Sequence, residues 1–394
     1  MKGYLRNDGR KGIRNIFLVV YLVECAHHVS REIVSRSGKD DVHLIGFGGC
    51  APNAYASDIL TGLCTHPNVG GVLLVSLGCE NIDCESLLHE ISSSGRPADC
   101  IVIQEEGGTS SSILRGLKKL EHLYGEMKSG IIETEFTYND LVIGCICGGS
   151  DATSGFTANP CVGLTYDRLV SFGSACIFEE PGELLGCEYE LAGRAASVSV
   201  GERLIDVIHK ADAYYKEMGH DSFSAGNAVG GLTTIEEKSL GSYCKSGSSI
   251  IKGVITPGEK PPCGGLYLMD VVPDGKVKWS FPNPNDNSEI TEMIASGSHL
   301  ILFTTGRGSV VGSAISPVIK ICANPETYSR MSDDMDINAG KIITEGISIA
   351  SVSDEVLSKI NAVCCGEKTK SEELGHKEFH ICYKYFSNIG ICKI

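Results

Sequence analysis

Several features that mark particular classes of protein are missing from this chain of 394 residues. Basic residues are not in excess, because 34 Lys and Arg stand against 49 Asp and Glu, and the net charge is −15. This balance argues against nucleic acid or an anionic membrane as the main partner, while a local positive site can still bind a small anion. No secretory signal is evident, and the first apolar run, Ile16 to Val23, is too short to cross a membrane. We therefore expect a cytoplasmic protein.

Proline is scarce, and no CxxC pair occurs. The chain has 13 prolines and 47 glycines, which indicates many tight loops rather than disorder. Its 18 cysteines are scattered and do not form the compact framework of a secreted protein. We expect most of them to be buried thiols that act as small apolar residues in a reducing compartment. A metal site is the other use that such a number of cysteines suggests.

Short apolar runs alternate with helix-like segments along the chain. The strand-like runs lie at 16–21, 42–47, 70–78, 98–104, 141–143, 174–180, 266–272, 299–306 and 317–324. This alternation predicts an α/β protein with Rossmann-like, doubly wound and mainly parallel sheets. A break near 129–139 predicts two domains, a first α/β domain over 1–130 and a C-terminal catalytic α/β domain over 131–394.

A polar, glycine-rich turn that holds Cys147 is the strongest candidate for a binding loop. Residues 141–160 read LVIGCICGGSDATSGFTANP, which is a strand, then a glycine turn, then a helix. Proteins of the α/β class build ligand sites at such carboxyl ends of strands, where glycines let the backbone approach a ligand closely. Ser150, Asp151 and Asn159 are the candidate binding residues of this turn.

Three cysteines occupy the same kind of position. Cys50, Cys79 and Cys147 each follow a predicted strand and lie in a glycine turn. Because the carboxyl ends of parallel strands converge on one edge of a sheet, three thiolates there could hold iron, either as one ion or as a cluster with an open coordination position. An open position is what a Lewis-acid catalyst needs. The alternative is that small residues, cysteine included, are common in tight turns.

Charged candidates follow other predicted strands. The segment TTGRGSVVGS (304–313) is not a P-loop, but Arg307 could bind a carboxylate bidentately and Lys320 could add a second positive charge. The alternative for Arg307 is a tight turn with the arginine in solvent. Glu180 lies in an acidic cluster at a strand end, and Lys238 lies in TTIEEKSLG, where burial could make it a base. The alternative for Lys238 is a salt-bridged surface helix.

Eight motifs in order resemble the altronate dehydratase/galactarate dehydratase family of sugar-acid dehydratases, over about residues 3–350. They are GYLRNDGRKGIRN, HPNVGGVLLVSLGCE, QEEGGT, CGGSDATSGFTANP, GGLTTIEEKSLG, FTTGRGS, PVIKI and DDMDINAG. The resemblance implies an iron-dependent hydro-lyase, with Fe²⁺ or an iron–sulfur cluster. Members remove water from a 2,3-dihydroxy acid to give a 2-keto-3-deoxy acid.

The resemblance also assigns roles to the candidates, because this reaction needs a base at C2, charge stabilisation at the carboxylate and help for the leaving hydroxyl. Lys238 or Glu180 would be the base. Arg307 and Lys320, with Thr305 beside them, would hold the substrate carboxylate. Substrate hydroxyls would meet Ser150, Asp151 and Asn159, and the metal would meet Cys50, Cys79 and Cys147.

Two departures from the family pattern leave the substrate and the partners open. Several members begin with a small SAF-type domain, whereas this chain starts at GYLRNDGR, so we expect either a separate small subunit or a protein that works without one. Ile146 replaces the Glu or Gln that sugar-acid dehydratases carry before Cys147. One alternative is therefore elimination from another 2-hydroxy acid, as in (2R)-sulfolactate sulfo-lyase. Another is a non-catalytic protein that binds a sugar acid. In each case we expect a small anionic hydroxy acid as ligand and a homo-oligomer.

Overall fold

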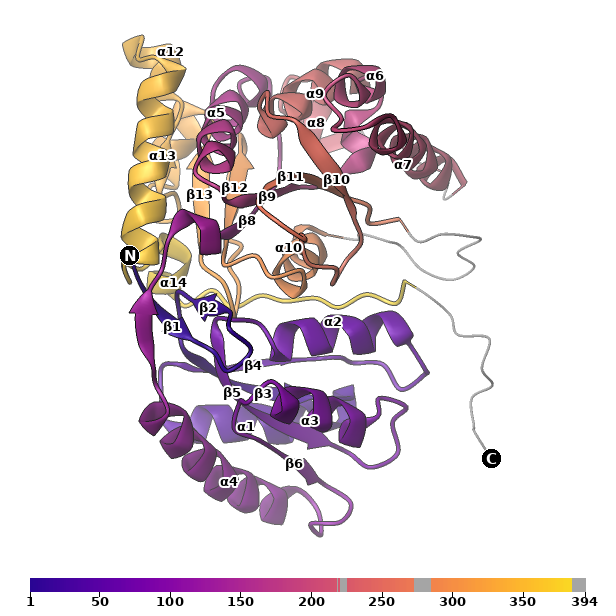
Figure 1. Ribbon diagram of the computed structural model, residues 1–394, viewed down its shortest axis with the longest axis vertical. Helices are drawn as coiled ribbons and strands as arrows, with labels where there is room; N and C mark the ends of the chain where they lie inside the picture. The colour runs from indigo at the N-terminus through magenta and orange to yellow at the C-terminus, as the bar shows by residue number, and fades with distance from the viewer. Residues whose placement is uncertain (218, 220–224, 273–284, 385–394) are drawn as a thin grey trace.

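The computed structural model describes residues 1–217, 219, 225–272 and 285–384, and Figure 1 shows them as two α/β units, one above the other. Each unit is built on one sheet, of four strands in the first and seven in the second. Every strand pairing within these two sheets is parallel. The predicted α/β class with mainly parallel sheets is therefore confirmed.

The first sheet has the spatial order β4-β3-β5-β6 and is covered by four helices. Its strands are β3 (Ile16–Tyr21), β4 (Val42–Gly46), β5 (Val69–Ser76) and β6 (Ala98–Val102), and its helices are α1 (His27–Ser37), α2 (Ala54–Cys64), α3 (Cys84–Ser93) and α4 (Thr109–Ser129). The two central strands, β3 and β5, are buried at every position, as expected of parallel strands covered on both faces. Apolar residues of α1 and α4 pack on one face of the sheet, and those of α2 and α3 pack on the other.

The second sheet is the larger one. Its strands, in the order β10-β11-β9-β8-β12-β13-β14, are β8 (Val142–Cys147), β9 (Ala175–Phe178), β10 (Ile251–Ile255), β11 (Gly265–Met269), β12 (Leu300–Thr305), β13 (Val318–Cys322) and β14 (Ile337–Asn338). Its helices are α5 (Ala158–Ser171), α6 (Glu188–Ala192), α7 (Val198–Glu217), α8 (Ala225–Val229), α9 (Ile235–Tyr243), α10 (Asp286–Ala295), α11 (Pro325–Arg330), α12 (Lys341–Glu345), α13 (Ile349–Cys364) and α14 (Lys370–Leu374). Helices α5, α7 and α13 share a buried cluster with one face of the sheet, and α10 covers the other face.

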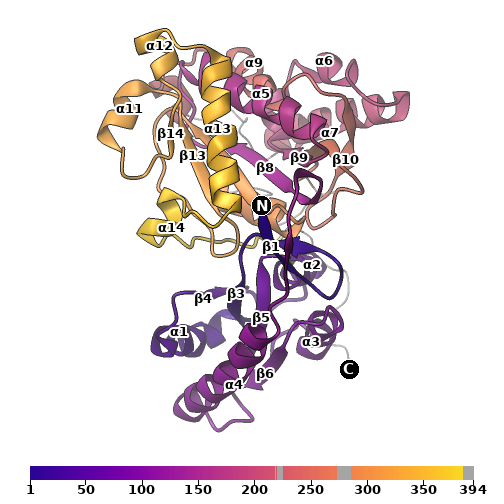
Figure 2. The same ribbon diagram turned by 60° about the vertical axis from the view of Figure 1, so that its left-hand side comes forward.

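A small antiparallel sheet lies at the waist between the two units (Figure 2). It consists of β2 (Lys11–Gly12), β1 (Lys2–Leu5) and β7 (Glu133–Glu135), in that order. The remaining regular segments are the 3₁₀ turns η1 (Glu24–Ala26), η2 (Tyr138–Asp140), η3 (Ser154–Phe156), η4 (Pro181–Leu184) and η5 (Cys244–Ser246).

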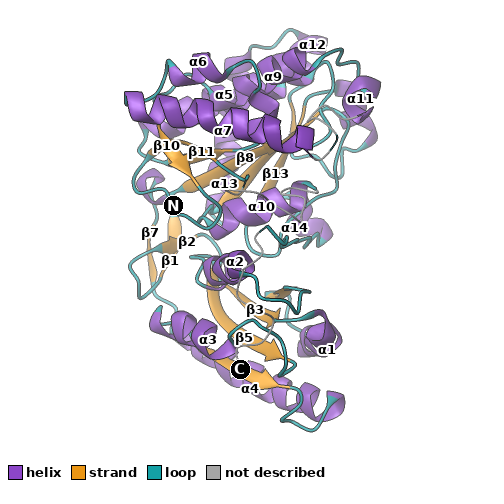
Figure 3. Ribbon diagram, turned by 90° about the vertical axis from the view of Figure 1, so that its right-hand side faces the viewer, coloured by secondary structure: helices purple, strands orange, loops and turns teal. Residues whose placement is uncertain are grey.

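One hydrophobic cluster joins the two units. Helices α2 and α10 lie between the two sheets (Figures 1 and 3), and their apolar residues belong to the same cluster. The helices approach closely at Gly62, where a Cβ atom would lie 2.6 Å from the backbone oxygen of Ala295. Residues 376–384 run along the same junction. There the fully buried Lys384 forms an ion pair with Glu292, which also accepts a hydrogen bond from the hydroxyl of Tyr55.

Candidate active site

Two neighbouring parallel strands place a thiol against two carboxylates at the carboxyl edge of the second sheet. Strand β8 ends at Cys147, and Glu180 and Glu183 follow the end of β9. The backbone N–H of Cys147 donates to Glu180 Oε2 at 3.0 Å. Its Sγ atom lies 3.4 Å from Glu180 Oε1 and 3.2 Å from Glu183 Oε2.

Two buried lysines neutralise these carboxylates. Helix α9 begins after Thr234, whose side chain caps the helix, and it carries Lys238 inward. The Nζ atom of Lys238 lies 2.5 Å from Glu183 Oε1. The next turn, η5, carries Lys245, whose ammonium group pairs with Glu180 Oε2. The result is a buried set of two carboxylates and two ammonium groups.

The surroundings give the two carboxylates different protonation behaviour. Burial, together with the neighbouring Glu183, raises the pKa of Glu180 from 4.5 to about 7, even though Lys245 lowers it. Burial also acts against ionisation of Glu183, but Lys238 and Lys245 outweigh it and lower the pKa of Glu183 to about 2. At neutral pH Glu183 is therefore ionised, while the raised pKa leaves Glu180 partly protonated.

The same surroundings hold the other three groups in one state. Burial alone would lower the pKa of both lysines, but the carboxylates and Cys147 outweigh it, so the pKa of Lys238 and that of Lys245 are raised. Burial, followed by the two nearby carboxylates, raises the pKa of the Cys147 thiol well above its ordinary value. Both lysines are therefore ammonium groups, and Cys147 is a neutral thiol.

The backbone of Glu180 is itself unusual. It has φ of 70° and ψ of 54°, and Glu180 is the one non-glycine residue with positive φ in the described part of the chain. This left-handed conformation costs about 1–3 kcal/mol and occurs mainly where function requires it. The strained backbone makes Glu180 a candidate for a functional role.

A cavity of about 260 Å³ opens beside this buried set. Lys238 lines it from α9, and Ser150 lines it from the glycine turn after β8. The hydroxyl of Ser150 also lies 3.5 Å from Cys147 Sγ. The cavity therefore gives a small ligand access to the edge of the charged set.

The three predicted binding residues of the glycine turn are brought together in this cavity. Ser150, Asp151 and Asn159 all line it. The carboxylate of Asp151 is occupied locally, since it accepts hydrogen bonds from Thr153 and Ser154 and from Asn324. Asn159 donates to the backbone oxygen of Gly241 at 3.0 Å. Its buried Oδ1 atom has no hydrogen-bond partner among the described residues, so a ligand hydroxyl could donate to it.

The predicted carboxylate-binding residues lie elsewhere at this edge. Arg307 is exposed, lies against Gly149 and donates to the backbone oxygen of Gly226 at 2.8 Å. The Thr305 hydroxyl holds its own turn, because it accepts from the N–H of Gly308 and donates to a carbonyl. Lys320 is fully buried within β13, on the sheet face opposite α5. Lys320 does not line the cavity.

The prediction that Cys50, Cys79 and Cys147 share one edge is wrong, because the strands before them belong to two sheets. Cys50 follows β4 and Cys79 follows β5, both in the four-stranded sheet, and both are exposed. Their loops do lie together, since Asn81 donates to the backbone oxygen of Cys50 at 2.7 Å. Cys147 is buried in the other sheet.

Sequence reasoning missed Lys245 altogether. Lys238 and Lys245 are seven residues apart, a spacing that puts two residues on the same side of a helix. The spacing of the two lysines was visible in the sequence. The glycine and serine residues between them, however, did not predict that the helical turns of α9 continue into η5. The carboxylate partners of both lysines follow β9, more than fifty residues earlier in the chain.

The arrangement can be tested for a metal ion. Within the described segments, Cys147, Glu180 and Glu183 are the one group of three potential ligands whose ligand atoms all lie within 4.8 Å of one another. A thiol with two carboxylates has suitable donor chemistry. Each carboxylate, however, already has a buried ammonium group as its counter-ion, and the thiol is neutral. A divalent cation would have to displace Lys238 and Lys245, so the residues as arranged do not fit a metal ion.

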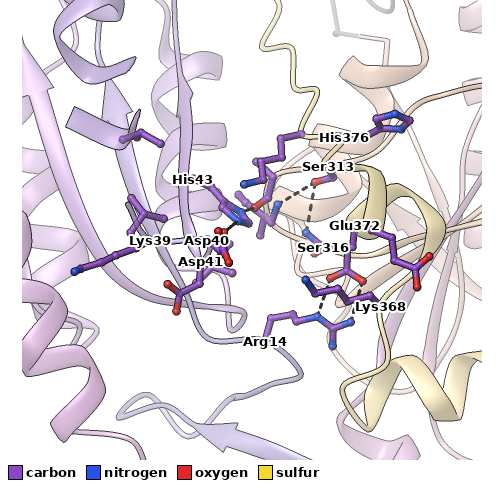
Figure 4. A pocket seen from close by; sticks show the side chains of 18 of the residues that line it. Arg14, Lys39, Asp40, Asp41, His43, Ser313, Ser316, Lys368, Glu372 and His376 are labelled. Atoms are coloured by element: carbon purple, nitrogen blue, oxygen red, sulfur yellow. Dashed lines mark hydrogen bonds and ion pairs between the residues drawn. The ribbon is translucent and has the colours of Figure 1, made fainter. Parts of the chain in front are cut away.

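A larger cavity, of about 620 Å³, lies near the amino ends of β3 and β4 (Figure 4). None of the predicted site residues lines it. Arg14 is tied there to Glu372 at 2.9 and 3.0 Å, and Asp41 is tied to Lys128 at 2.6 Å. Because much of its charge is neutralised internally and ligands of α/β sheets bind at carboxyl ends, the smaller cavity is the better candidate.

Within the described ranges, no helix combines the length and the apolar character that a membrane crossing needs.

Two family models together match most of the chain. The model described as D-galactarate/Altronate dehydratase, C-terminal, matches residues 138–387, and the model described as D-galactarate dehydratase/Altronate hydrolase, second domain, matches residues 3–128. The chain belongs to the D-galactarate/altronate dehydratase family. The resemblance that the eight motifs indicated is confirmed, and with it the expectation of an enzyme.

Three similar proteins show how the family varies. Galactarate dehydratase (L-threo-forming) of Escherichia coli is 33% identical over an alignment of 402 positions. The alignment covers 95% of this chain and 74% of that protein. Altronate dehydratase of Bacillus subtilis is 29% identical, with 96% and 77% covered. The (2R)-sulfolactate sulfo-lyase subunit beta of Chromohalobacter salexigens is 31% identical, with 98% and 97% covered.

Proposed function

We propose that this enzyme is a carbon–oxygen lyase that removes water from a sugar acid of the altronate or galactarate type and yields a 2-keto-3-deoxy acid. The observation that carries the proposal is the buried Glu180, whose pKa of about 7 suits a group that takes up and returns a proton near neutrality. Two ammonium groups lie beside it, and they can stabilise the negative charge that develops when a proton leaves C2.

The charged set suggests a division of roles: Lys238 lines the cavity, and Glu180 lies behind it, beyond the cavity lining. Glu180 takes the C2 proton, and the electron pair left at C2 forms the C2–C3 double bond as the 3-hydroxyl leaves. The same carboxyl group then returns its proton to that hydroxyl, so that water departs and the enol rearranges to the keto acid. Lys238 is an ammonium group in this arrangement, which favours it as the partner of the substrate carboxylate and argues against it as the base.

Polar groups of the cavity serve the remaining contacts in this proposal. Ser150 and Asn159 hold substrate hydroxyls, and the unpartnered Oδ1 of Asn159 is the acceptor. Asp151 does not contact the substrate in this proposal, and its role is to stabilise the turn that positions Ser150. Arg307, at the exposed rim of the same edge, is the proposed second contact for the carboxylate. Thr305 stabilises the turn that holds Arg307. Lys320, which does not line the cavity, has no role in this proposal.

Iron dependence stays a proposal that rests on the family resemblance. When bound, Fe²⁺ or an iron–sulfur cluster would act as a Lewis acid on the leaving hydroxyl. The residues around Cys147 do not fit it as arranged, and none of the steps above depends on it. The exposed thiols of Cys50 and Cys79, whose loops are joined by the hydrogen bond of Asn81, are the remaining candidates from the prediction.

Elimination of sulfite from (2R)-sulfolactate is a second candidate, and one comparison favours it. The subunit beta of sulfolactate sulfo-lyase is matched over 97% of its length, whereas the dehydratases are matched over 74–77%. The chemistry is related, because a C2 proton is again removed beside a carboxylate. Sulfite, a stable anion, leaves C3 without first taking a proton, so the second proton transfer of Glu180 would be unnecessary.

The same relative supports a proposal about partners, because its name describes one subunit of a larger enzyme. We propose that this chain works with a separate small subunit of the SAF type and that copies of the chain also associate as a homo-oligomer. The described cysteines are all free thiols, which supports the proposal of a reducing, cytoplasmic location.

A panel of substrates tests the function. The protein, purified under anaerobic conditions with and without a co-expressed small subunit, is incubated with altronate, galactarate and (2R)-sulfolactate. Formation of a 2-keto-3-deoxy acid from one of the sugar acids is the expected result. Sulfite release from sulfolactate alone would replace the proposal with the second candidate. Binding of a sugar acid without turnover in every preparation would favour a non-catalytic protein.

A further inference from the structure

Two half-buried thiols face each other in the first unit. Cys84 is the first residue of α3, and Cys100 lies in β6, sixteen residues later. Their Sγ atoms are 2.6 Å apart. The S–S bond of a disulfide is about 2.05 Å long, so the two sulfur atoms lie only about half an ångström beyond bonding distance.

Regular secondary structure fixes this approach. Side chains alternate between the two faces of β6, so Ile101 packs toward α1 and α4, whereas Cys100 packs toward α3. Helix α3 starts at Cys84 because the carboxylate of Asp83 accepts the N–H of Ser86 at 3.0 Å and caps the helix. The two thiols therefore meet without help from a mobile loop.

We propose that Cys84 and Cys100 form a redox-active dithiol that closes to a disulfide when a small-molecule disulfide oxidises it. The thiolate of Cys100 attacks one sulfur of the oxidant, and a first thiolate leaves. The thiolate of Cys84 then attacks the Cys100 sulfur of the mixed disulfide, and a second thiolate leaves. The two cysteines lose two protons and two electrons, and the oxidant is reduced to two thiols.

Local charge supports Cys100 as the attacking group. The Cys84 and Cys100 thiols lie within hydrogen-bond distance, and either can be the donor. The Nζ atom of Lys119 donates to the backbone oxygen of Cys100 at 2.8 Å and also pairs with Asp99 at 2.8 Å. The contact with Cys84 outweighs burial and lowers the pKa of Cys100, and Lys119 acts in the same direction. Both thiols are partly exposed, so a small oxidant can reach them.

The disulfide would fix a loop that borders the carboxyl edge of the first sheet. The segment between β5 and α3 carries Glu80, whose carboxylate accepts the N–H groups of Leu77, Gly78 and Cys79. Asn81 ties the segment to the loop that holds Cys50. A covalent link at the first residue of α3 would anchor this segment to β6.

The test uses the full-length protein and oxidised glutathione. Reduced protein is equilibrated in glutathione buffers of increasing redox potential, free thiols are alkylated, and peptides are mapped by mass spectrometry. We expect a peptide pair joined through Cys84 and Cys100, and a loss of two from the 18 thiols. A closed loop of this length is worth about 3 kcal/mol, which for a chain of this size should raise the melting temperature by about 4 °C on oxidation.

Matched variants separate the two roles. Cys84→Ser should accumulate glutathione on Cys100, whereas Cys100→Ser should leave Cys84 largely unmodified. Cys365→Ser, which removes an exposed thiol of the second unit, should oxidise like the wild type. The proposal would be overturned if Cys84 and Cys100 were both still alkylated at redox potentials that oxidise other cysteines. Equal glutathionylation of the two serine variants would also overturn it, because Cys100 would then not be the attacking thiol.

Discussion

Glu180→Gln should change how the stability of this protein depends on pH, and the size of the change follows from the site. The pKa of Glu180 is raised from 4.5 to about 7 in the folded protein, chiefly by burial. Between these values the folded state binds a proton that the unfolded state has lost. Stability from this group is therefore present at low pH and is lost as the pH rises toward 7.

At about 1.36 kcal/mol for each pKa unit, the rise from 4.5 to about 7 corresponds to about 3 kcal/mol. A glutamine does not titrate, so it lacks this loss. The free energy of unfolding of Glu180→Gln, measured against the wild type, should therefore improve by about 3 kcal/mol between pH 4.5 and pH 7.5. At any one pH, the difference in the free energy of unfolding between variant and wild type also includes altered hydrogen bonds with Lys245 and Cys147. The change of this difference with pH does not include them.

Urea unfolding of both proteins across this range measures the trend. Glu237→Gln is the control, because Glu237 is exposed and the N–H of Thr233 holds its pKa below the ordinary value, so it stays ionised over most of the window. Stability curves of Glu180→Gln and wild type that stay parallel from pH 4.5 to 7.5 would refute a raised pKa at Glu180.

Three further predictions follow from the charged set and the junction. Lys245→Met removes an ammonium group that lowers the pKa of Glu180. The limb near pH 7 in the plot of kcat/KM against pH should therefore move to higher pH. A limb that does not move would contradict the pairing of Lys245 with Glu180. Gly62→Ala should destabilise the protein by about 1–3 kcal/mol, because the new Cβ meets the backbone of α10. Gly125→Ala, in an open helical position, is the control and should stabilise the protein by about 1 kcal/mol. Thermal unfolding in which both variants shift the melting temperature in the same direction would argue against the close approach at Gly62. Lys384→Met leaves a buried carboxylate unpaired and should cost about 3–5 kcal/mol in urea unfolding, and a cost below 1 kcal/mol would show that the pair is not buried in solution.

The fold could be read from the sequence because its signals are local. The strand-like run at 16–21 and the structure's β3 coincide, and the predicted run at 98–104 contains β6. Buried apolar runs followed by glycine turns specify parallel strands whatever lies elsewhere in the chain. Local patterns do not say which strands share a sheet, however, and the cysteine prediction failed for this reason.

The site was only partly predictable for a related reason. Ser150, Asp151 and Asn159 lie within ten residues of one another, so their proximity was visible in the sequence. The pairing of Lys245 with Glu180 joins residues 65 positions apart, and no local pattern contains it. The raised pKa of Glu180 arises from burial and from Glu183, and burial of a charged residue depends on the finished fold.

Turnover in D₂O tests the central claim most directly. With the substrate that the panel identifies, the wild type should release a keto acid that carries solvent deuterium at C3, since the enol takes its new proton from water. Glu180→Gln should bind the substrate, as judged by calorimetry, and lose turnover by at least about 100-fold, the usual scale of a general acid–base residue. Glu188→Gln, which removes a carboxylate tied to the N–H of Gly186 away from the cavity, should behave like the wild type. Wild-type turnover and deuterium incorporation by Glu180→Gln would contradict the account, because Glu180 could then not be the group that moves the proton.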